Sequence, residues 1–167
     1  MFVRSCSAEE LNQLLESGDS VLEYLDCRGI RIDGLDFAGR HLRWVRFSQA
    51  ELRKCSFREA TLECVFADLA TITECRFDDA LVFESVFAGS HMQDTAFIGA
   101  TADQCNFNGI EAQNSDFSDA SLRQSRFLNA RLTAVSFINC DLKNTLFQFS
   151  SRDQVSFKHS NHEEAYF

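Results

Sequence analysis

The residues best suited to acid–base or metal chemistry are few and scattered in this 167-residue chain. His159 and His162 precede Glu163 and Glu164, a combination of residue types that binds metals in other proteins. Two histidines three positions apart on a bent strand, however, do not share a face. The two remaining histidines stand far away in the sequence, at His41 and His91. The sequence therefore predicts no metal site and no cofactor.

Nucleophilic and phosphate-binding arrangements are also missing from the sequence. No serine or cysteine has a general base beside it in the sequence; a triad formed by residues that are distant in the sequence is the alternative. Three glycines recur ten residues apart, as turn residues do, and none belongs to a GxGxxG phosphate loop: Gly89, Gly99 and Gly109. We therefore predict no catalytic residues and a protein that is not an enzyme.

The dominant feature is instead a period of five residues. Phenylalanine recurs every ten residues from Phe37 to Phe167 and is replaced only at Ala67. Midway between these positions stand mostly aliphatic residues: Leu42, Leu52, Leu62, Ile72, Val82, Met92, Leu122, Leu132 and Leu142. A small residue usually comes two positions before each large one, a pattern that fills a narrow core. A period of five fits neither a helix nor a flat strand, so the chain must turn a corner every five residues.

Runs such as Ala50-Glu-Leu52-Arg-Lys and Ala120-Ser-Leu122-Arg-Gln resemble the A-(D/N)-L-x-x unit of the pentapeptide-repeat family. The resemblance covers roughly residues 27–167. It implies an all-β fold, a right-handed quadrilateral parallel β-helix of about seven coils with four five-residue sides in each coil. At about 4.8 Å per stacked strand, such a rod is roughly 33 Å long.

Residues 1–26 do not repeat and are expected to form an N-terminal cap. Ser7 and Glu10 form a capping box, leucines follow at helical spacing, and Gly18 is a stop signal. We expect a short amphipathic helix over the end of the solenoid; a helix that binds a partner is the alternative. At the other end the repeat is still in register at Phe167. An uncapped coil exposes backbone edges, so we expect a homodimer through the C-terminal coil, or a partner that caps it.

The cysteines and the hydropathy pattern favour a cytoplasmic protein without membrane contact. No apolar segment approaches 18 residues, and the N-terminus lacks the hydrophobic core of a signal peptide. The seven cysteines are odd in number and form no CxxC pair. Four of them occupy small inward positions of the repeat and are expected to be buried thiols: Cys55, Cys75, Cys105 and Cys140. A disulfide between Cys55 and Cys75 is the alternative.

Side chains twenty residues apart share a side of the predicted solenoid. On the side that contains Phe47, Ala67 and Phe87, seven of fifteen outward positions are apolar, against one on the side that contains Ile72. Such a contrast is typical of an interaction surface. We define the apolar stripe as Phe66, Leu69, Val86, Leu128, Leu146, Phe149 and Tyr166. The alternative is a register defect at Ala67 that turns Phe66 and Leu69 inward.

Charge is segregated along the predicted rod. Residues 59–119, the acidic waist, hold twelve acids against one base, whereas residues 28–58 are net +5 and residues 120–158 net +4. Five of the acids project from one side: Glu59, Asp78, Asp79, Asp116 and Asp119. B-DNA carries one charge per about 1.7 Å, so the charge density is comparable over roughly 15 Å, which is less than half a duplex turn. A solvated acidic surface without a target is the alternative.

Two functions of different class follow. The first is a non-enzymatic interaction or scaffold module that docks a protein or its own copy through the apolar stripe and the C-terminal coil. The resemblance implies the second, because bacterial members of the family include proteins that mimic DNA and bind type II topoisomerases. DNA gyrase or topoisomerase IV is then the expected partner. The net charge of −9 disfavours direct binding of nucleic acid.

Overall fold

Corners of the chain are formed by residues in the left-handed backbone conformation. Every fifth residue from Tyr24 to His159 has a positive φ, and most of them are not glycine; Lys54 has φ 52° and Asp79 has φ 56°. This conformation costs a non-glycine residue roughly 1–2 kcal/mol, so contacts between coils must offset it. The five-residue period is therefore the spacing of the corners.

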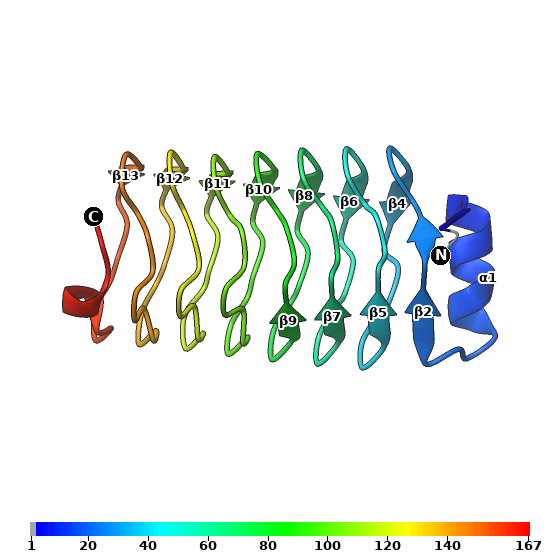
Figure 1. The fold of residues 1–167 in the computed structure, drawn as a ribbon. Coiled ribbons are helices and arrows are strands. Elements are labelled where there is room, and N and C mark those ends of the chain that lie inside the picture. The colour runs from blue at the N-terminus through cyan, green and yellow to red at the C-terminus, as the bar shows by residue number, and fades with distance from the viewer. Residues whose placement is uncertain (1–2) are drawn as a thin grey trace.

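The computed structural model describes residues 3–167 as a four-sided rod of stacked coils with one α-helix at its N-terminal end (Figure 1). Residues 21–160 make seven coils of twenty residues, and residues 161–167 begin an eighth. The elements are β1 (Arg4–Ser5), α1 (Ala8–Glu16), β2 (Val21–Glu23), β3 (Leu25–Asp26), β4 (Arg31–Asp33), β5 (His41–Arg43), β6 (Glu51–Arg53), β7 (Thr61–Glu63), β8 (Thr71–Thr73), β9 (Leu81–Phe83), β10 (His91–Gln93), β11 (Glu111–Gln113), β12 (Arg131–Thr133), β13 (Ser151–Asp153) and the 3-10 turn η1 (His162–Glu164).

The strands stack in parallel with a register of twenty residues. We number the four five-residue sides of each coil in chain order, beginning at residue 21. Side 1 carries the sheet β2-β5-β7-β9, and side 3 carries the sheet β13-β12-β11-β10-β8-β6-β4. Single bridges repeat along the other two sides, through Phe66 and Val86 on side 2 and through Arg76 and Ala96 on side 4. The parallel β-helix predicted from the sequence is confirmed. No helix in residues 3–167 is long and apolar enough to span a membrane.

Two ladders of stacked phenylalanine rings fill the interior. On side 4 the rings of Phe77 and Phe97 lie 4.4 Å apart and nearly parallel, and the ladder runs from Phe37 to Phe157. Side 2 carries the second ladder, and rings of the two ladders meet edge to face, as Phe97 and Phe107 do at 5.9 Å. Stacked and edge-to-face pairs both satisfy the aromatic quadrupole. The side 4 ladder is thus continuous, whereas Ala67 interrupts the side 2 ladder between Phe47 and Phe87.

The N-terminal segment covers the first coil as the sequence predicts. Ser7 is the N-cap of α1, and its side chain and that of Glu10 form the reciprocal capping box. Leu11 is fully buried against the solenoid core. Strand β1 extends side 2 by pairing with β3, and strand pairing of the solenoid begins at Val21. This segment therefore closes the apolar interior at one end.

Every cysteine is a buried free thiol, so the alternative of a Cys55–Cys75 disulfide is not adopted. Cys75 lies one coil beyond Cys55, and its sulfur accepts the Cys55 N–H at 3.4 Å. Burial raises the pKa of Cys105 and of Cys140 to about 12, from an ordinary thiol value of 9.0. These side chains pack as small apolar residues rather than as nucleophiles.

The raised thiol pKa values predict a loss of stability in alkali. In the unfolded chain the thiols ionise from about pH 9, whereas Cys105 and Cys140 stay neutral in the folded chain until about pH 12. Below about pH 9 the two thiols contribute fully to the free energy of unfolding. Between about pH 9 and about pH 12, each thiol lowers that free energy by about 1.4 kcal/mol per pH unit. Urea denaturation between about pH 8 and about pH 10.5, with a reductant present, measures this slope.

The control is the double variant Cys105→Ala, Cys140→Ala, because alanine fills the same small position at Ala60 and Ala120. Its stability should decline less steeply with pH than that of the wild type. Parallel slopes for the two proteins would contradict the assignment of these thiols.

Candidate functional site

The apolar stripe lies on side 2 and points outward. Bridges join Phe66 to Val86 and Leu146 to Tyr166, so these residues stand in one column. Ala67 is buried, with 2% of its surface exposed, while Leu69 is 57% exposed. The register is therefore intact at Ala67, and the alternative of an inward-facing Phe66 and Leu69 is wrong.

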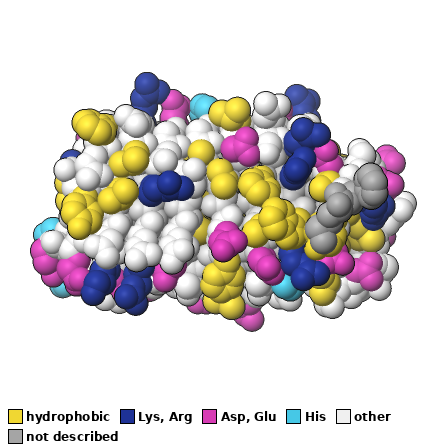
Figure 2. All heavy atoms as spheres, viewed as in Figure 1, with side chains coloured by type: hydrophobic (Ala, Val, Ile, Leu, Met, Phe, Trp, Pro, Cys, Tyr) yellow, Lys and Arg dark blue, Asp and Glu magenta, His cyan; other side chains and the backbone are white. Residues whose placement is uncertain are grey.

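The stripe is divided into two patches rather than continuous. The N-terminal patch contains Phe66, Leu69 and Val86, and the C-terminal patch contains Leu128, Leu146, Phe149 and Tyr166. Asn106 and Arg126 stand between the two patches in the same column. Figure 2 shows hydrophobic side chains gathered in separate groups on this face, with a basic side chain between them. Phe149 is 87% exposed, the most exposed of the large apolar residues within residues 3–167.

Sequence reasoning missed the aromatic residue that enlarges the N-terminal patch. Trp44 stands at a corner of side 1, is 42% exposed, and its ring centroid lies 6.3 Å from that of Phe66. The signal was present, because a corner position of this repeat is usually polar or glycine and Trp44 is the single tryptophan of the chain. Exposed Leu81 and Phe83, on β9, were missed in the same way.

The five acids assigned to one side do lie together on side 4, but they do not form one acidic surface. Glu59, Asp79 and Asp119 are exposed at corners. Asp116 is half-buried and accepts bonds from the amide and the hydroxyl of Ser118. The expected column is therefore reduced to three exposed corner carboxylates.

Asp78 corrects the sequence-based assignment of an outward-projecting acid. It is 6% exposed, and its Oδ2 atom accepts from Arg58 Nε at 3.1 Å and from Arg76 Nε at 2.8 Å. Two guanidinium groups thus neutralise it within the protein. The residue holds adjacent coils together and is not available to a partner.

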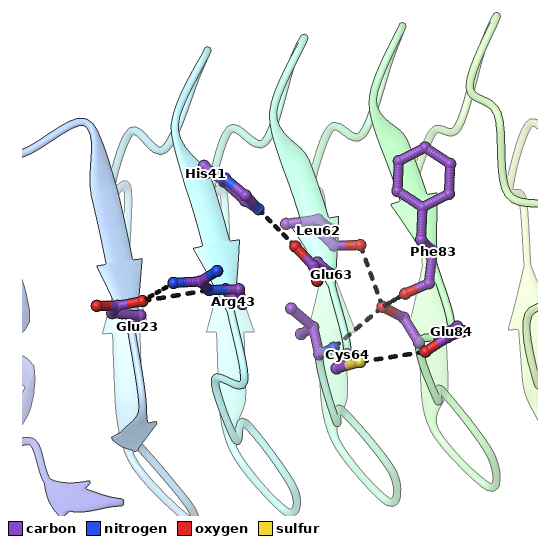
Figure 3. A network of polar contacts seen from close by, with 10 residues as sticks. Glu23, His41, Arg43, Leu62, Glu63, Cys64, Phe83 and Glu84 are labelled. Carbon is purple, nitrogen blue, oxygen red and sulfur yellow. Dashed lines mark hydrogen bonds and ion pairs between the residues drawn. The ribbon is translucent and has the colours of Figure 1, made fainter.

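Other acids of the waist are paired in the same manner with bases on adjacent coils. Glu111 contacts Arg131 and His91, and Glu74 lies 3.8 Å from Arg53. Figure 3 shows the same arrangement on side 1, where Glu63 contacts His41 at 3.1 Å. A register of twenty residues brings the bases that flank the waist next to its acids. The acidic waist is therefore less charged at its surface than its composition indicates.

No group of three or more potential metal ligands occurs in the part of the chain that the structure describes. His159 is at a corner of side 4, and His162 begins η1. The hollow along side 3 is lined by His91, Glu111 and Arg131, which already pair with one another. The charged groups of the side 3 hollow are thus paired within the protein, and the apolar stripe remains the candidate site.

Family models identify the class of protein. "Pentapeptide repeats (8 copies)" matches residues 41–79, and "Pentapeptide repeat region" matches residues 80–167. Together the two models cover more than half of the chain, and the chain belongs to the pentapeptide-repeat family. No curated protein sequence matches it significantly.

Several solved structures are similar to the chain at low identity. HetL, involved in heterocyst differentiation regulation in the cyanobacterium Nostoc sp. strain PCC 7120, is 14% identical over 96% of both chains, with a TM-score of 0.33. Rfr23 from the cyanobacterium Cyanothece 51142 is 13% identical over 96% of this chain and 99% of its own, with a TM-score of 0.34. The plasmid-mediated fluoroquinolone resistance protein QnrB1 is 11% identical over 98% and 92%, with a TM-score of 0.29. Likenesses of this size do not assign a function to this chain.

The buried carboxylate predicts different outcomes for two neighbouring residues. Asp78→Asn should lower the free energy of unfolding by about 1–3 kcal/mol, because the charge that two guanidinium groups contact is lost. The matched control Asp79→Asn removes an exposed carboxylate and should change stability by less than about 0.5 kcal/mol. Urea denaturation measures both variants, and equal effects would contradict the buried arrangement.

Proposed function

We propose that this chain is a non-enzymatic protein-interaction module that docks a partner protein, or its own copy, through the apolar stripe and the C-terminal coil. The observation that carries this proposal is the exposure of large apolar residues on side 2, above all Phe149 at 87%. Exposed apolar groups that cluster on one side usually mark an interaction surface.

Energetics favour the two patches as anchor points. Burying a side chain the size of Phe149 contributes on the order of 1.5–3 kcal/mol, and aromatic residues are enriched at the centre of protein interfaces. Trp44 and Phe66 form a second aromatic pair at the other patch. A rigid rod presents both patches in a fixed geometry, so little conformational entropy is lost from the patches when a partner binds.

The C-terminal coil is the proposed contact for a second copy. Strand β13 pairs only with β12 among the strands of residues 3–167, which leaves one of its edges without a strand. Close to it stand Phe167, 48% exposed, and Arg152, whose guanidinium lies 4.8 Å from the centroid of the Phe167 ring. An edge of this kind can pair with another chain. The C-terminal patch of the stripe continues onto this coil through Tyr166.

Polar substitution at both patches should abolish docking without unfolding the rod. The double variant Phe66→Ser, Phe149→Ser removes one aromatic anchor from each patch, and we expect at least about tenfold weaker partner binding. A pull-down from host lysate, quantified by mass spectrometry against wild type, measures it. The matched control is Val21→Ser, an exposed apolar residue on side 1. Normal recovery of every partner by the double variant would refute the stripe as the docking surface.

A second candidate, a DNA-mimicking modulator of type II topoisomerase, is supported by the exposed carboxylates of Glu59, Asp79 and Asp119 on side 4. These corner residues lack ion pairs in the described chain, unlike Asp78. The column is short, because Gly99 occupies the corner between Asp79 and Asp119. This candidate therefore rests on three exposed carboxylates, whereas the sequence predicted five.

The second candidate predicts a charge-dependent effect on DNA gyrase. Wild-type protein should alter supercoiling in a salt-sensitive way, and the variant Glu59→Lys, Asp79→Lys, Asp119→Lys should lose most of the effect. A supercoiling assay at two salt concentrations measures it, with Asp36→Lys outside the waist as the control. A gyrase effect that survives charge reversal would exclude mimicry through this side.

A further inference from the structure

The hydrogen bonds that join the corners of successive coils have one gap between Tyr24 and Asn144, and it lies on side 1. Every corner residue from Tyr24 to Asn144 except Glu84 donates its N–H to a carbonyl of the next coil. Cys64 donates to Phe83 at 3.0 Å, and Gln104 donates to Arg123 at 2.8 Å. The Glu84 N–H has no backbone acceptor within residues 3–167.

A change in the path of the chain causes this gap. The sheet β2-β5-β7-β9 ends at β9, and from Thr101 onward the chain on side 1 turns at residues 103–104 instead of continuing as a strand. The change coincides with the replacement of Val82 by the much smaller Ala102 at the central position. The Asp103 carbonyl is therefore not bonded to Glu84, although its counterpart on the preceding coil, the Phe83 carbonyl, accepts from Cys64.

A hollow of about 470 Å³ opens at this gap. Its lining consists of one aromatic ring, one amide and three carboxylates: Glu63, Phe83, Glu84, Asp103 and Gln104. We call it the β9 hollow. Figure 3 shows Phe83 standing out from β9, with Glu63 on the adjacent strand and Glu84 at the following corner. Phe83 is 41% exposed, and the residues twenty positions before and after it, Glu63 and Asp103, are both acidic.

The carboxylates of the β9 hollow are incompletely matched by the protein itself. Glu63 pairs with His41 at 3.1 Å. Glu84 accepts only the Cys64 thiol, at 3.5 Å, and Asp103 accepts the Ser121 hydroxyl at 2.6 Å and the Arg123 amide at 3.0 Å. Neither Glu84 nor Asp103 has an ion pair in the described chain, so the hollow has negative charge beside an exposed ring.

We propose that the β9 hollow binds an arginine side chain presented by an extended segment of a partner protein. A planar guanidinium stacks on the face of Phe83 and donates to the carboxylates of Glu84 and Asp103. The unbonded N–H of Glu84 donates to a backbone carbonyl of the same segment. This inference rests on the proposed function only in taking a protein as the partner, and it uses a different side of the rod.

The charge of the hollow decides against other occupants. An anion would meet three carboxylates, and a neutral apolar side chain would leave the charges of Glu84 and Asp103 without an ionic partner. An ammonium group satisfies the charge but is a compact point donor that cannot stack as a guanidinium does. Arginine matches both the ring and the acids.

The test is a titration of the isotope-labelled full chain with the peptide acetyl-Gly-Arg-Gly-amide, followed by NMR amide shifts. We expect saturable shifts at Phe83, Glu84 and Gln104 with a dissociation constant on the order of 1 mM, weakened by salt. The neutral analogue with citrulline should bind at least about tenfold more weakly, and the lysine peptide should also bind less well.

Variants locate the binding and separate it from the apolar stripe. Phe83→Leu and Glu84→Gln should each weaken the arginine peptide by about five- to tenfold, whereas Phe149→Leu on side 2 should leave it unchanged. Absence of saturable shifts, or equal binding of the citrulline peptide, overturns the proposal, and equal binding of the lysine peptide overturns the choice of arginine. Because the probe is a peptide, failure here leaves the stripe and its partner untouched.

Discussion

The whole structure depends on the stacking of one coil on the next at a register of twenty residues. Corner residues adopt a left-handed backbone conformation that is unfavourable for most side chains, and their N–H groups are satisfied only by the following coil. Phenylalanine rings stack along the same direction at 4.4–5.2 Å. A single coil has neither contact, so the coils stabilise one another and require closure by β1 and α1 at the N-terminal end.

The same register governs the surface. A side chain has as its nearest neighbours the residues twenty positions before and after it, so charges that are distant in sequence become ion pairs along the rod. Arg58 and Asp78 meet in this way, as do Arg131 and Glu111. Composition therefore overstates the negative charge at the surface of the central coils, because bases of the flanking coils form ion pairs with their acids. What remains unmatched is local: exposed aromatic residues on side 2 and the carboxylates beside Phe83 on side 1.

Regularity also makes departures informative. In a ladder where every other interior corner is bonded, one unbonded N–H at Glu84 coincides with a hollow, an exposed ring and unpaired carboxylates. A filled solenoid has no internal cavity for a ligand, so recognition has to use its sides. The apolar stripe and the β9 hollow lie on adjacent sides of the rod, sides 2 and 1.

The sequence by itself determined the fold, because one large and one small residue in every five fit only a chain that turns at each unit. It likewise determined the capping box of Ser7 and Glu10, a local motif, but it left open whether Phe66 and Leu69 face outward, which the intact register at Ala67 decided. Tertiary structure alone decided which outward groups are free. Asp78 is adjacent in sequence to the exposed Asp79 yet lies buried between two arginines, since Arg58 on the preceding coil and Arg76, two positions before it, both donate to its carboxylate. The gap at Glu84 likewise arises from a change of turn on the next coil, which a five-residue pattern does not record.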